Sequence, residues 1–281
     1  MRALINLSGN MRMNRMIHED KNKTADISCM ETLQLAGKII MENGGETYRA
    51  EETVNLMGVG FGLDDVDCFA VPSGLFISYR GQDGEPVTGI RRVHRHARNL
   101  TRVNEANQVS REAVNGNMDF HQAYRRLKEI EKMPGDFSGH WCFPAAFLCA
   151  AGFSTLFGGG AVDILCAGAV AAFVQVMENF LRRFRSRGLA ASVLGGLLTA
   201  LLPYLIRLVL PDMQPETVIA GAVMPLVPGL AMTNAVQDTM RGDMLSGLSH
   251  GTQAILSACL IAGGAVLALG IMNLITGGAA L

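Results

Sequence analysis

The sequence predicts a polytopic α-helical membrane protein of five transmembrane helices with an N-terminal cytoplasmic α+β domain. Two features of the composition carry this prediction. Hydrophobic residues make up 49% of the 281 residues and charged residues only 17%, whereas a typical soluble domain has about 25% charged residues. The charges are also unevenly placed, because 37 of the 49 charged side chains lie in residues 1–140. The first half therefore has the composition of a soluble domain, and the second half has too few charges to face water.

The distribution of charged and hydrophobic residues divides the chain into a flexible N-terminal segment (residues 1–23), a cytoplasmic α+β domain (24–138) and a transmembrane domain (139–281). Residues 1–23 lack the run of about 7–15 apolar residues that a secretory signal peptide needs, so we expect the N-terminus in the cytoplasm. The net charge of −1 gives no strong positive field, and we therefore expect no nucleic-acid partner. Membrane lipid is the expected surrounding of the second half.

Periodicity in the cytoplasmic part predicts two helices, three strands and two further helices. Apolar residues recur at helical spacing near both ends, and the period falls to two in between. The expected elements are helices 24–43 and 46–57, strands 65–71, 75–79 and 87–93, and helices 98–114 and 119–133. A domain of roughly 110 residues is large enough for its own hydrophobic core.

Five apolar segments of the second half approach the length of about 20 residues that a spanning helix needs. They cover residues 141–157, 162–177, 189–209, 217–236 and 252–275. The first two are short and meet at Gly158–Gly160, so one long buried hairpin is an alternative interpretation. Pairs of small residues such as Gly195-Gly196 and Gly263-Gly264 recur in these segments. Such pairs let helices approach closely in lipid and indicate a packed bundle.

Basic residues in short loops indicate the orientation. Four arginines between residues 182 and 187 follow the second segment, whereas the loop 211–216 after the third segment is acidic. The arginines are expected inside and the acidic loop outside. Five crossings then place the N-terminus in the cytoplasm and the C-terminus outside.

Motifs for catalysis and metal binding do not support an enzyme. The chain has no HExxH, GxGxxG or GxxxxGK[ST] sequence, and we expect no nucleophile elbow. We therefore assign no catalytic residue, no metal ligand and no cofactor. His94 and His96 would share one face of a strand, but no third metal ligand accompanies them. We interpret the basic run 91–98 as an edge that faces solvent or lipid headgroups.

The helix expected at 46–57 begins with a dense run of hydrogen-bonding side chains, Glu46 to Thr53. On a helix, Arg49 lies one turn from Glu46 on one side and from Glu52 and Thr53 on the other, so both sides can clamp it. The alternative is a surface ladder of ion pairs, each contributing a few tenths of a kcal/mol. The candidate residues of this cytoplasmic motif, two of them from the helix at 98–114, are Glu46, Tyr48, Arg49, Glu51, Asn104 and Asn107.

The fourth apolar segment is interrupted by its own sequence. Pro225 and Pro228 remove backbone donors, and Gly229 follows them directly, so we expect the helix to break near mid-membrane. Thr233, Asn234 and Asp238 follow within the next turns. A broken helix with polar residues at the break indicates the substrate site of a transporter. A simple kink is the alternative.

Charged side chains are costly inside a membrane, at about 2.5–3.5 kcal/mol for a carboxylate at a helix centre. Asp163 follows three glycines at the start of the second segment. It either caps that helix near the outer surface or lines a polar pathway. The candidate substrate pathway comprises Asp163, Pro225, Pro228, Gly229, Thr233, Asn234 and Asp238.

Five short motifs follow one another along the chain: Glu46–Thr53, Val71–Ser78, Gly158–Asp163, Pro225–Gly229 and Thr233–Asp238. In order and spacing they resemble the motifs of the threonine/serine exporter family, and the resemblance extends from residue 30 to residue 275. One position departs from the family pattern, because Ala161 stands where an acidic residue is common. Asp163 is therefore the single carboxylate of the glycine motif.

The resemblance implies an exporter of small hydrophilic metabolites such as threonine and serine in the inner membrane of a bacterium. Some two-component relatives are linked to the export of dicarboxylates such as succinate. Split members of the family divide into a larger subunit, like this chain, and a small hydrophobic membrane subunit that supplies the second half of the transporter. The expected partner is this small subunit, and a homo-oligomer is a further option.

We hypothesise export driven by the proton gradient, in which Asp163 and Asp238 bind the ammonium group of an amino acid or exchange protons. The alternative is a membrane-anchored hydrolase or sensor whose cytoplasmic domain carries the activity. Expression of residues 1–138 alone would discriminate, because catalysis or a ligand response retained in this fragment would favour the alternative.

Overall fold

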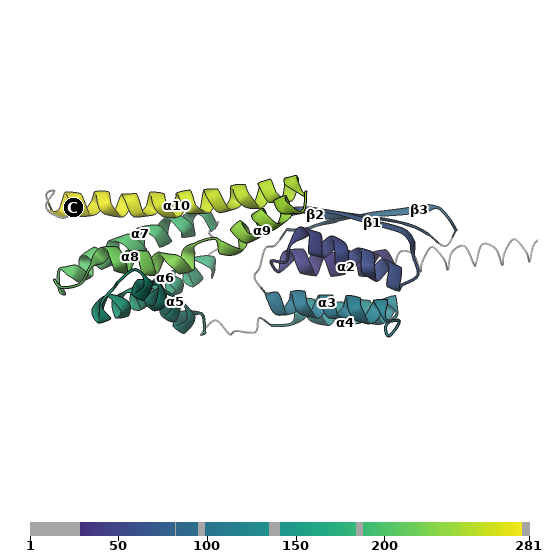
Figure 1. Ribbon diagram of the computed structural model, residues 1–281, viewed down its shortest axis with the longest axis horizontal. Coiled ribbons are helices and arrows are strands. Elements are labelled where there is room, and N and C mark those ends of the chain that lie inside the picture. The colour runs from purple at the N-terminus through teal and green to yellow at the C-terminus, as the bar shows by residue number, and fades with distance from the viewer. Residues whose placement is uncertain (1–28, 82, 95–98, 135–140, 184–187, 277–281) are drawn as a thin grey trace, which may run out of the picture. The chain divides into compact units, whose positions relative to one another are not determined.

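The computed structural model describes residues 29–81, 83–94, 99–134, 141–183 and 188–276 (Figure 1). The chain forms two compact units. The first comprises Met1–Asp136 and Asn234–Ser249, and the second comprises Phe137–Thr233 and His250–Leu281. The segment expected to be flexible, residues 1–23, lies outside the described residues.

The described part of the first unit starts with a helix over residues 29–42 and follows the order of elements expected from the sequence. The elements after this helix are α2 (Thr47–Gly60), β1 (Asp64–Val71), β2 (Gly74–Arg80), β3 (Pro86–Arg92), α3 (Leu100–Val114) and α4 (Phe120–Lys132). Asp119 and Gln122 form a capping box at the start of α4, which satisfies amide groups that the first turn leaves unpaired. Residues 234–249 add the end of α9 and the start of α10 to this unit.

The three strands form an antiparallel sheet in the order β1-β2-β3. Because side chains alternate between the two faces of a strand, one face buries Cys68, Leu75 and Ile77. On the other face Phe69 pairs with Phe76, and Phe76 with Ile90. These last three side chains are exposed within the described structure.

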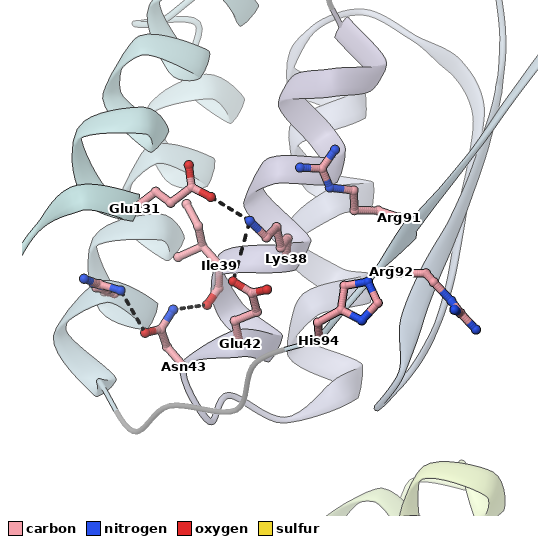
Figure 2. Close-up of a pocket in the computed structure, with 9 residues that line it drawn as sticks. Lys38, Ile39, Glu42, Asn43, Arg91, Arg92, His94 and Glu131 are labelled. Atoms are coloured by element: carbon pink, nitrogen blue, oxygen red, sulfur yellow. Dashed lines mark hydrogen bonds and ion pairs between the residues drawn. The ribbon is translucent and has the colours of Figure 1, made fainter. Parts of the chain in front are cut away.

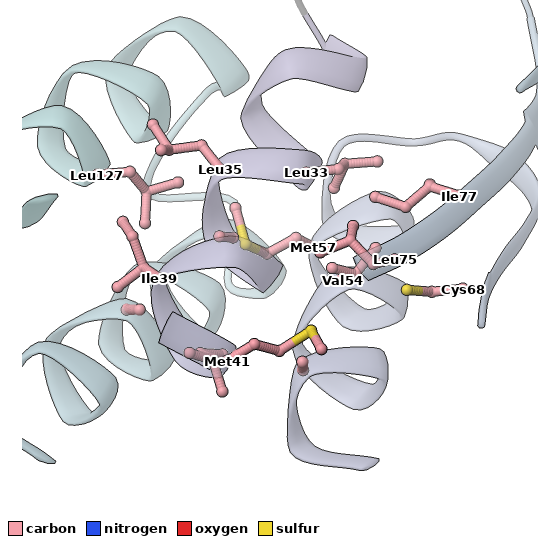
Figure 3. Close-up of a cluster of buried hydrophobic side chains, with 14 of the residues drawn as sticks. Leu33, Leu35, Ile39, Met41, Val54, Met57, Cys68, Leu75, Ile77 and Leu127 are labelled. Atoms are coloured by element: carbon pink, nitrogen blue, oxygen red, sulfur yellow. The ribbon is translucent and has the colours of Figure 1, made fainter. Parts of the chain in front are cut away.

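The hydrophobic core of the first unit lies on both sides of a middle layer made by the helix 29–42 and α2. The sheet covers one side of this layer, and α3 and α4 cover the other (Figure 1). Figure 3 shows side chains that meet in this core, among them Leu33, Ile39, Met57, Ile77 and Leu127. Full burial of one such side chain stabilises the fold by about 1.5–3 kcal/mol.

The second unit is entirely helical in its described part. Its helices, two of which continue into the first unit, are α5 (Cys142–Leu156), α6 (Ala161–Arg183), α7 (Gly188–Arg207), α8 (Pro215–Val223), the 3-10 turn η1 (Met224–Leu226), α9 (Gly229–Met240) and α10 (Met244–Thr276). Three stretches are long and apolar enough to span a membrane: Ala161–Leu181, Ala190–Arg207 and Met244–Ile275. The bent pair Pro215–Leu226 and Gly229–Met240 makes a fourth candidate.

The protein is thus a mostly helical, polytopic membrane protein with three or four candidate spans among its described residues. The fifth span expected at 141–157 is not confirmed. Helix α5 occupies that segment but has only 15 residues, which is about 22 Å of helix against a hydrocarbon core of about 30 Å. It packs against α6 and α8.

Small residues bring the helices of the second unit into close contact, as the sequence predicted. A Cβ atom added at Gly196 of α7 would collide with the carbonyl oxygen of Ile261, and one at Gly264 of α10 with that of Val193. Gly221 of α8 meets Ala150 of α5 in the same way. At each of these points the backbone of one helix touches the next, which only glycine allows.

Candidate functional site

The predicted break in the fourth candidate span is confirmed. Helix α8 ends at Val223, one 3-10 turn follows, and Val227 then adopts an extended conformation before α9 begins at Gly229. The two helical segments meet at 59°. Because Pro225 and Pro228 carry no amide hydrogen, neither can bond the carbonyl four residues before it.

An apolar pocket of about 370 Å³ lies beside this break. It is lined by Val223, Val227 and Pro228 of the broken span and by residues of α7 and α10, including Gly196 and Ile261. The hydroxyl group of Thr199, which also lines it, donates a hydrogen bond to the carbonyl of Gly195 at 2.7 Å. The pocket next to the break is therefore apolar, and it is not lined by Thr233, Asn234 or Asp238.

The polar residues that follow the break lie along α9. The Thr233 hydroxyl donates to the carbonyl of Gly229 at 2.9 Å, and Asn234 and Asp238 are buried. Within the first unit, Asp238 Oδ2 lies 3.5 Å from the hydroxyl of Thr47, the first residue of α2. Helix α2 has no acidic residue in its first turn, so Asp238 supplies negative charge where the helix dipole favours it.

Asp163 holds two parts of the second unit together. Its carboxylate accepts one hydrogen bond from the amide of Gly160 at 2.9 Å and another from the amide of Gln214 at 2.8 Å. Gln214 is the N-cap of α8, and Pro225 lies eleven residues further on, which corresponds to about 16 Å along a helix. These contacts are those of a helix cap and a loop tether.

The cytoplasmic motif forms part of a polar pocket of about 370 Å³ in the first unit, between α2 and α3. The two helices lie side by side (Figure 1). The lining residues are Tyr48, Arg49, Glu52, Thr53 and Leu56 of α2, Asn107, Ser110 and Arg111 of α3, and Arg241, which follows α9.

Hydrogen bonds and ring contacts order the walls of this pocket, hereafter the α2–α3 pocket. The hydroxyl of Thr53 donates to Asn107 Oδ1 at 2.9 Å, which joins the two helices. Arg49 Nε lies 2.9 Å from a carboxylate oxygen of Glu46. The guanidinium carbon of Arg241 lies 3.5 Å from the centre of the Tyr48 ring. Arg49 thus pairs with Glu46 of the two acids expected, and no ion pair with Glu52 occurs among the described residues.

Three of the predicted motif residues do not line the α2–α3 pocket: Glu46, which pairs with Arg49, Glu51 and Asn104. Glu51 points to the sheet and accepts a hydrogen bond from the amide of Ala70 at 2.8 Å. Burial raises the pKa of Glu51; the Ala70 amide opposes the rise, and the negative charges of Asp243, Asp67 and Asp238 add to it. Asn104 is exposed and does not line the pocket.

Arg241 is a pocket residue that sequence reasoning did not predict. It directly follows a candidate span, where a basic residue is commonly only a sign of orientation. Nothing local links it to Tyr48, which lies almost two hundred positions earlier. The available signal was a lone cation close to the carboxylates Asp238 and Asp243 in an otherwise charge-poor half.

A second polar pocket, of about 570 Å³, lies in the first unit where the helix 29–42 meets the end of the sheet (Figure 2). Lys38 Nζ lies 2.6 Å from Glu131 and 3.6 Å from Glu42. Burial alone would raise the pKa of Glu131, but hydrogen bonds and charge from Lys38 and Lys128 outweigh it, and the pKa is lowered. Arg91, Arg92 and His94 add exposed basic groups.

The structure bears on two further expectations about chemistry. The described residues contain no group of three or more His, Cys, Asp or Glu side chains that could hold a metal ion, and His96 lies outside them. The sequence from Gly247 to Gly251 does match the GxSxG pattern, contrary to the expectation that the chain has no nucleophile elbow motif. It lies inside α10 and not at a strand-to-helix turn, so it forms no elbow.

Comparison with known proteins places these features in a family. The model of the ThrE family, described as "Putative threonine/serine exporter", matches residues 31–272. The chain belongs to this threonine/serine exporter family. The family is one of membrane transporters, and nearly the whole chain takes part in the match.

Three relatives of the family are bacterial. The chain is 25% identical to the "Probable succinate transporter subunit YjjP" of Escherichia coli, over 85% of this chain and 92% of the relative. It is 24% identical to a protein of the same name from Klebsiella aerogenes, over 82% of this chain and 88% of the relative. A "Probable threonine/serine exporter" of Mycobacterium tuberculosis is 22% identical over 86% of this chain and 46% of the relative. No solved structure matches the chain.

Proposed function

We propose that the protein is the larger subunit of a two-component exporter of small hydrophilic metabolites in the inner membrane of a bacterium. The helix break at Pro225–Gly229 is the observation that carries this proposal. Broken helices near the middle of a membrane are costly and occur where a transporter binds or passes its substrate. The match to relatives named as a transporter subunit and as an exporter supports the same function.

The partner is a small hydrophobic membrane subunit that supplies the second half of the transporter. This chain spans 92% of a relative that is itself named a subunit, but only about half of the mycobacterial exporter, at 46%. The rest of that longer relative lies outside the match. A homo-oligomer of the larger subunit is compatible with the same arrangement.

The substrates suggested by the names of the relatives are threonine, serine and succinate. All three carry a carboxylate and are too polar to cross a bilayer unaided. Residues 24–138 face the cytoplasm in this proposal and receive the substrate there. If α5 crosses the membrane as the fifth span, the C-terminus lies outside.

The substrate passes the break at Pro225, Pro228 and Gly229 and the polar side of α9. Thr233, Asn234 and Asp238 lie on that helix, and Asp238 is the buried carboxylate among them. A buried carboxylate can exchange a proton with the gradient that drives export. Asp163 is a second candidate for this proton exchange. Its hydrogen bonds to two backbone amides, however, favour a structural role.

Efflux from cells tests the proposal. Bacteria that lack their own exporters would carry the chain together with its small subunit and be loaded with labelled succinate or threonine. Asp238→Asn should lower efflux by about tenfold or more, since a neutral amide cannot exchange a proton. Asp212→Asn, in the loop before α8, is the matched control and should leave efflux unchanged. Wild-type efflux by Asp238→Asn at equal membrane levels would refute this assignment of the pathway.

The alternative function is a membrane-anchored hydrolase or sensor. The polar α2–α3 pocket favours it, because a pocket in the first unit could serve without transport. A sensor would respond to its ligand without moving it. Efflux of a labelled metabolite that depends on the chain would therefore exclude the alternative as the sole function.

A further inference from the structure

We infer that the α2–α3 pocket binds a small dicarboxylate. The inference rests on the proposed function and names the class of metabolite that the cytoplasmic part would recognise. It goes beyond the break in the fourth candidate span, because the pocket lies in the first unit.

The charge of the lining favours an anion. Three guanidinium groups (Arg49, Arg111 and Arg241) face the cavity together with one carboxylate, Glu52. With Glu46, which pairs with Arg49, one positive charge remains in excess. An amino-acid zwitterion would leave it uncompensated, whereas a dicarboxylate would compensate it and place one carboxylate at each of the two other guanidinium groups. Guanidinium groups bind carboxylates with two parallel hydrogen bonds, which add geometric specificity to the electrostatic attraction.

Two of the three guanidinium groups are available for a ligand. Glu46 already pairs with Arg49. The guanidinium carbon of Arg241 lies 3.5 Å from the centre of the Tyr48 ring, and a guanidinium held by a ring in this way keeps N–H groups with which to bind a carboxylate. Among the described residues Arg241 forms no ion pair, and Arg111 bonds only the neutral side chain of Gln108, at 3.5 Å. One open guanidinium is therefore present for each carboxylate of a dicarboxylate.

Neutral polar groups between the arginines complete the site. Thr53 and Ser110 line the pocket although their side chains are 4% and 3% exposed. Asn107 accepts the Thr53 hydroxyl through its carbonyl oxygen, so its amide N–H groups are left to donate. Leu56 offers an apolar surface to a short methylene chain. A volume of about 370 Å³ is at the small end of ligand pockets.

Arg241 gives binding a mechanical consequence. It directly follows α9 (Gly229–Met240), the helix that starts at the break. A dicarboxylate held by Arg111 of α3 and by Arg241 would fix the end of α9 to α3. Ligand binding in the α2–α3 pocket would then restrict the position of α9, the helix whose start forms the break.

Calorimetry on the purified full chain in phosphatidylcholine nanodiscs tests the inference, with succinate as the probe and L-threonine and sulfate as comparators. Wild-type protein should bind succinate in a saturable way. Arg111→Gln and Arg241→Gln should each weaken binding by about tenfold or more, the usual effect of losing a charge-assisted hydrogen bond. Arg125→Gln on α4 is the matched control, because Arg125 is exposed and lies outside the pocket, and it should bind like the wild type.

Three results would overturn the inference: no saturable succinate binding by the wild type, equal displacement by sulfate, or unchanged affinity in both arginine variants. Melting curves check folding, and Arg111→Gln, on the exposed surface of α3, serves if Arg241→Gln unfolds. Cellular efflux separates this inference from the proposed function. Efflux without succinate binding would refute the inferred binding site and leave the proposed exporter function intact. Binding without efflux of any probe would support the binding site and refute the proposed exporter function.

Discussion

The guanidinium group of Arg241 lies over the ring of Tyr48, with 3.5 Å between its carbon and the ring centre. Tyr48 belongs to the first turn of α2, and Arg241 follows the last residue of α9. The contact therefore fastens the end of the broken span to the start of a helix in the same unit. A cation over an aromatic face contributes about 0.5–2 kcal/mol, depending on its exposure to solvent.

Tyr48→Leu should loosen the turn after α9, because the aliphatic side chain has no negative ring face to hold Arg241. Faster amide hydrogen exchange is expected around residues 238–244 of the full protein, corresponding to a loss of about 1 kcal/mol locally. Tyr48→Phe keeps the ring and should exchange like the wild type. Equal exchange in all three proteins would show that the stacking contributes nothing.

Gly264→Ala should destabilise the bundle, whereas Gly263→Ala should not. A Cβ at residue 264 meets the carbonyl oxygen of Val193, but a Cβ at residue 263 has nothing within 4 Å. Overpacking of this kind costs about 1–3 kcal/mol. The melting temperatures of the two purified variants, neighbours on one helix, make a matched comparison, and identical values would contradict the close packing of α7 and α10.

Asp163→Ala should lower the melting temperature of the protein, because the amides of Gly160 and Gln214 both lose their acceptor. The loss should amount to about 1–3 kcal/mol. Asp163→Asn retains one acceptor oxygen, so its melting temperature should lie between those of Asp163→Ala and the wild type. A variant that melts like the wild type but no longer supports efflux would place Asp163 in the substrate pathway instead.

Lys38→Met should destabilise α4 at neutral pH but not in acid. The pKa of Glu131 lies below its ordinary value of 4.5, so its ionised form favours the fold. That contribution is present above pH 4.5 and is lost as the pH falls through the lowered pKa. Hydrogen exchange of α4 in the full protein should therefore differ between variant and wild type by about 1–2 kcal/mol at pH 7.

The same difference should vanish well below pH 4, where Glu131 is protonated in both proteins. Lys132→Met is the control for a changed charge on α4, because Lys132 is exposed and forms no ion pair among the described residues. A difference that persisted in acid would mean that Lys38 acts through packing and not through charge.

The break at Pro225 and Pro228 could be predicted because its cause is local. A proline removes a backbone donor wherever the residue lies, and no distant contact is needed to interpret it. The strands of the first unit could be predicted for the same reason, since the spacing of apolar residues changes from a period of 3.6 to a period of two at Asp64–Val71. Among the described residues, element boundaries there differ from expectation by at most three residues, and the largest difference is at the end of α2, at Gly60 instead of residue 57.

Features that depend on distant packing could not be predicted. The apolar pocket beside Pro228 is made by α7 and α10, whose approach is fixed by glycines on facing helices. Glu51 and Arg49 are two residues apart, yet one bonds the sheet and the other lines the α2–α3 pocket. Helical residues two apart do not share a face, but only the tertiary fold decides what each face meets.

The central claim is that the break between α8 and α9 is needed for export. The double variant Pro225→Ala, Pro228→Ala restores the missing amide donors and lets the two segments continue as one helix. Pro203→Ala is the matched control, because Pro203 lies inside the continuous helix α7. Efflux of labelled succinate and threonine, measured at equal membrane levels of each protein with its small subunit, should be lost in the double variant and retained in Pro203→Ala. Full efflux by the double variant would contradict the account.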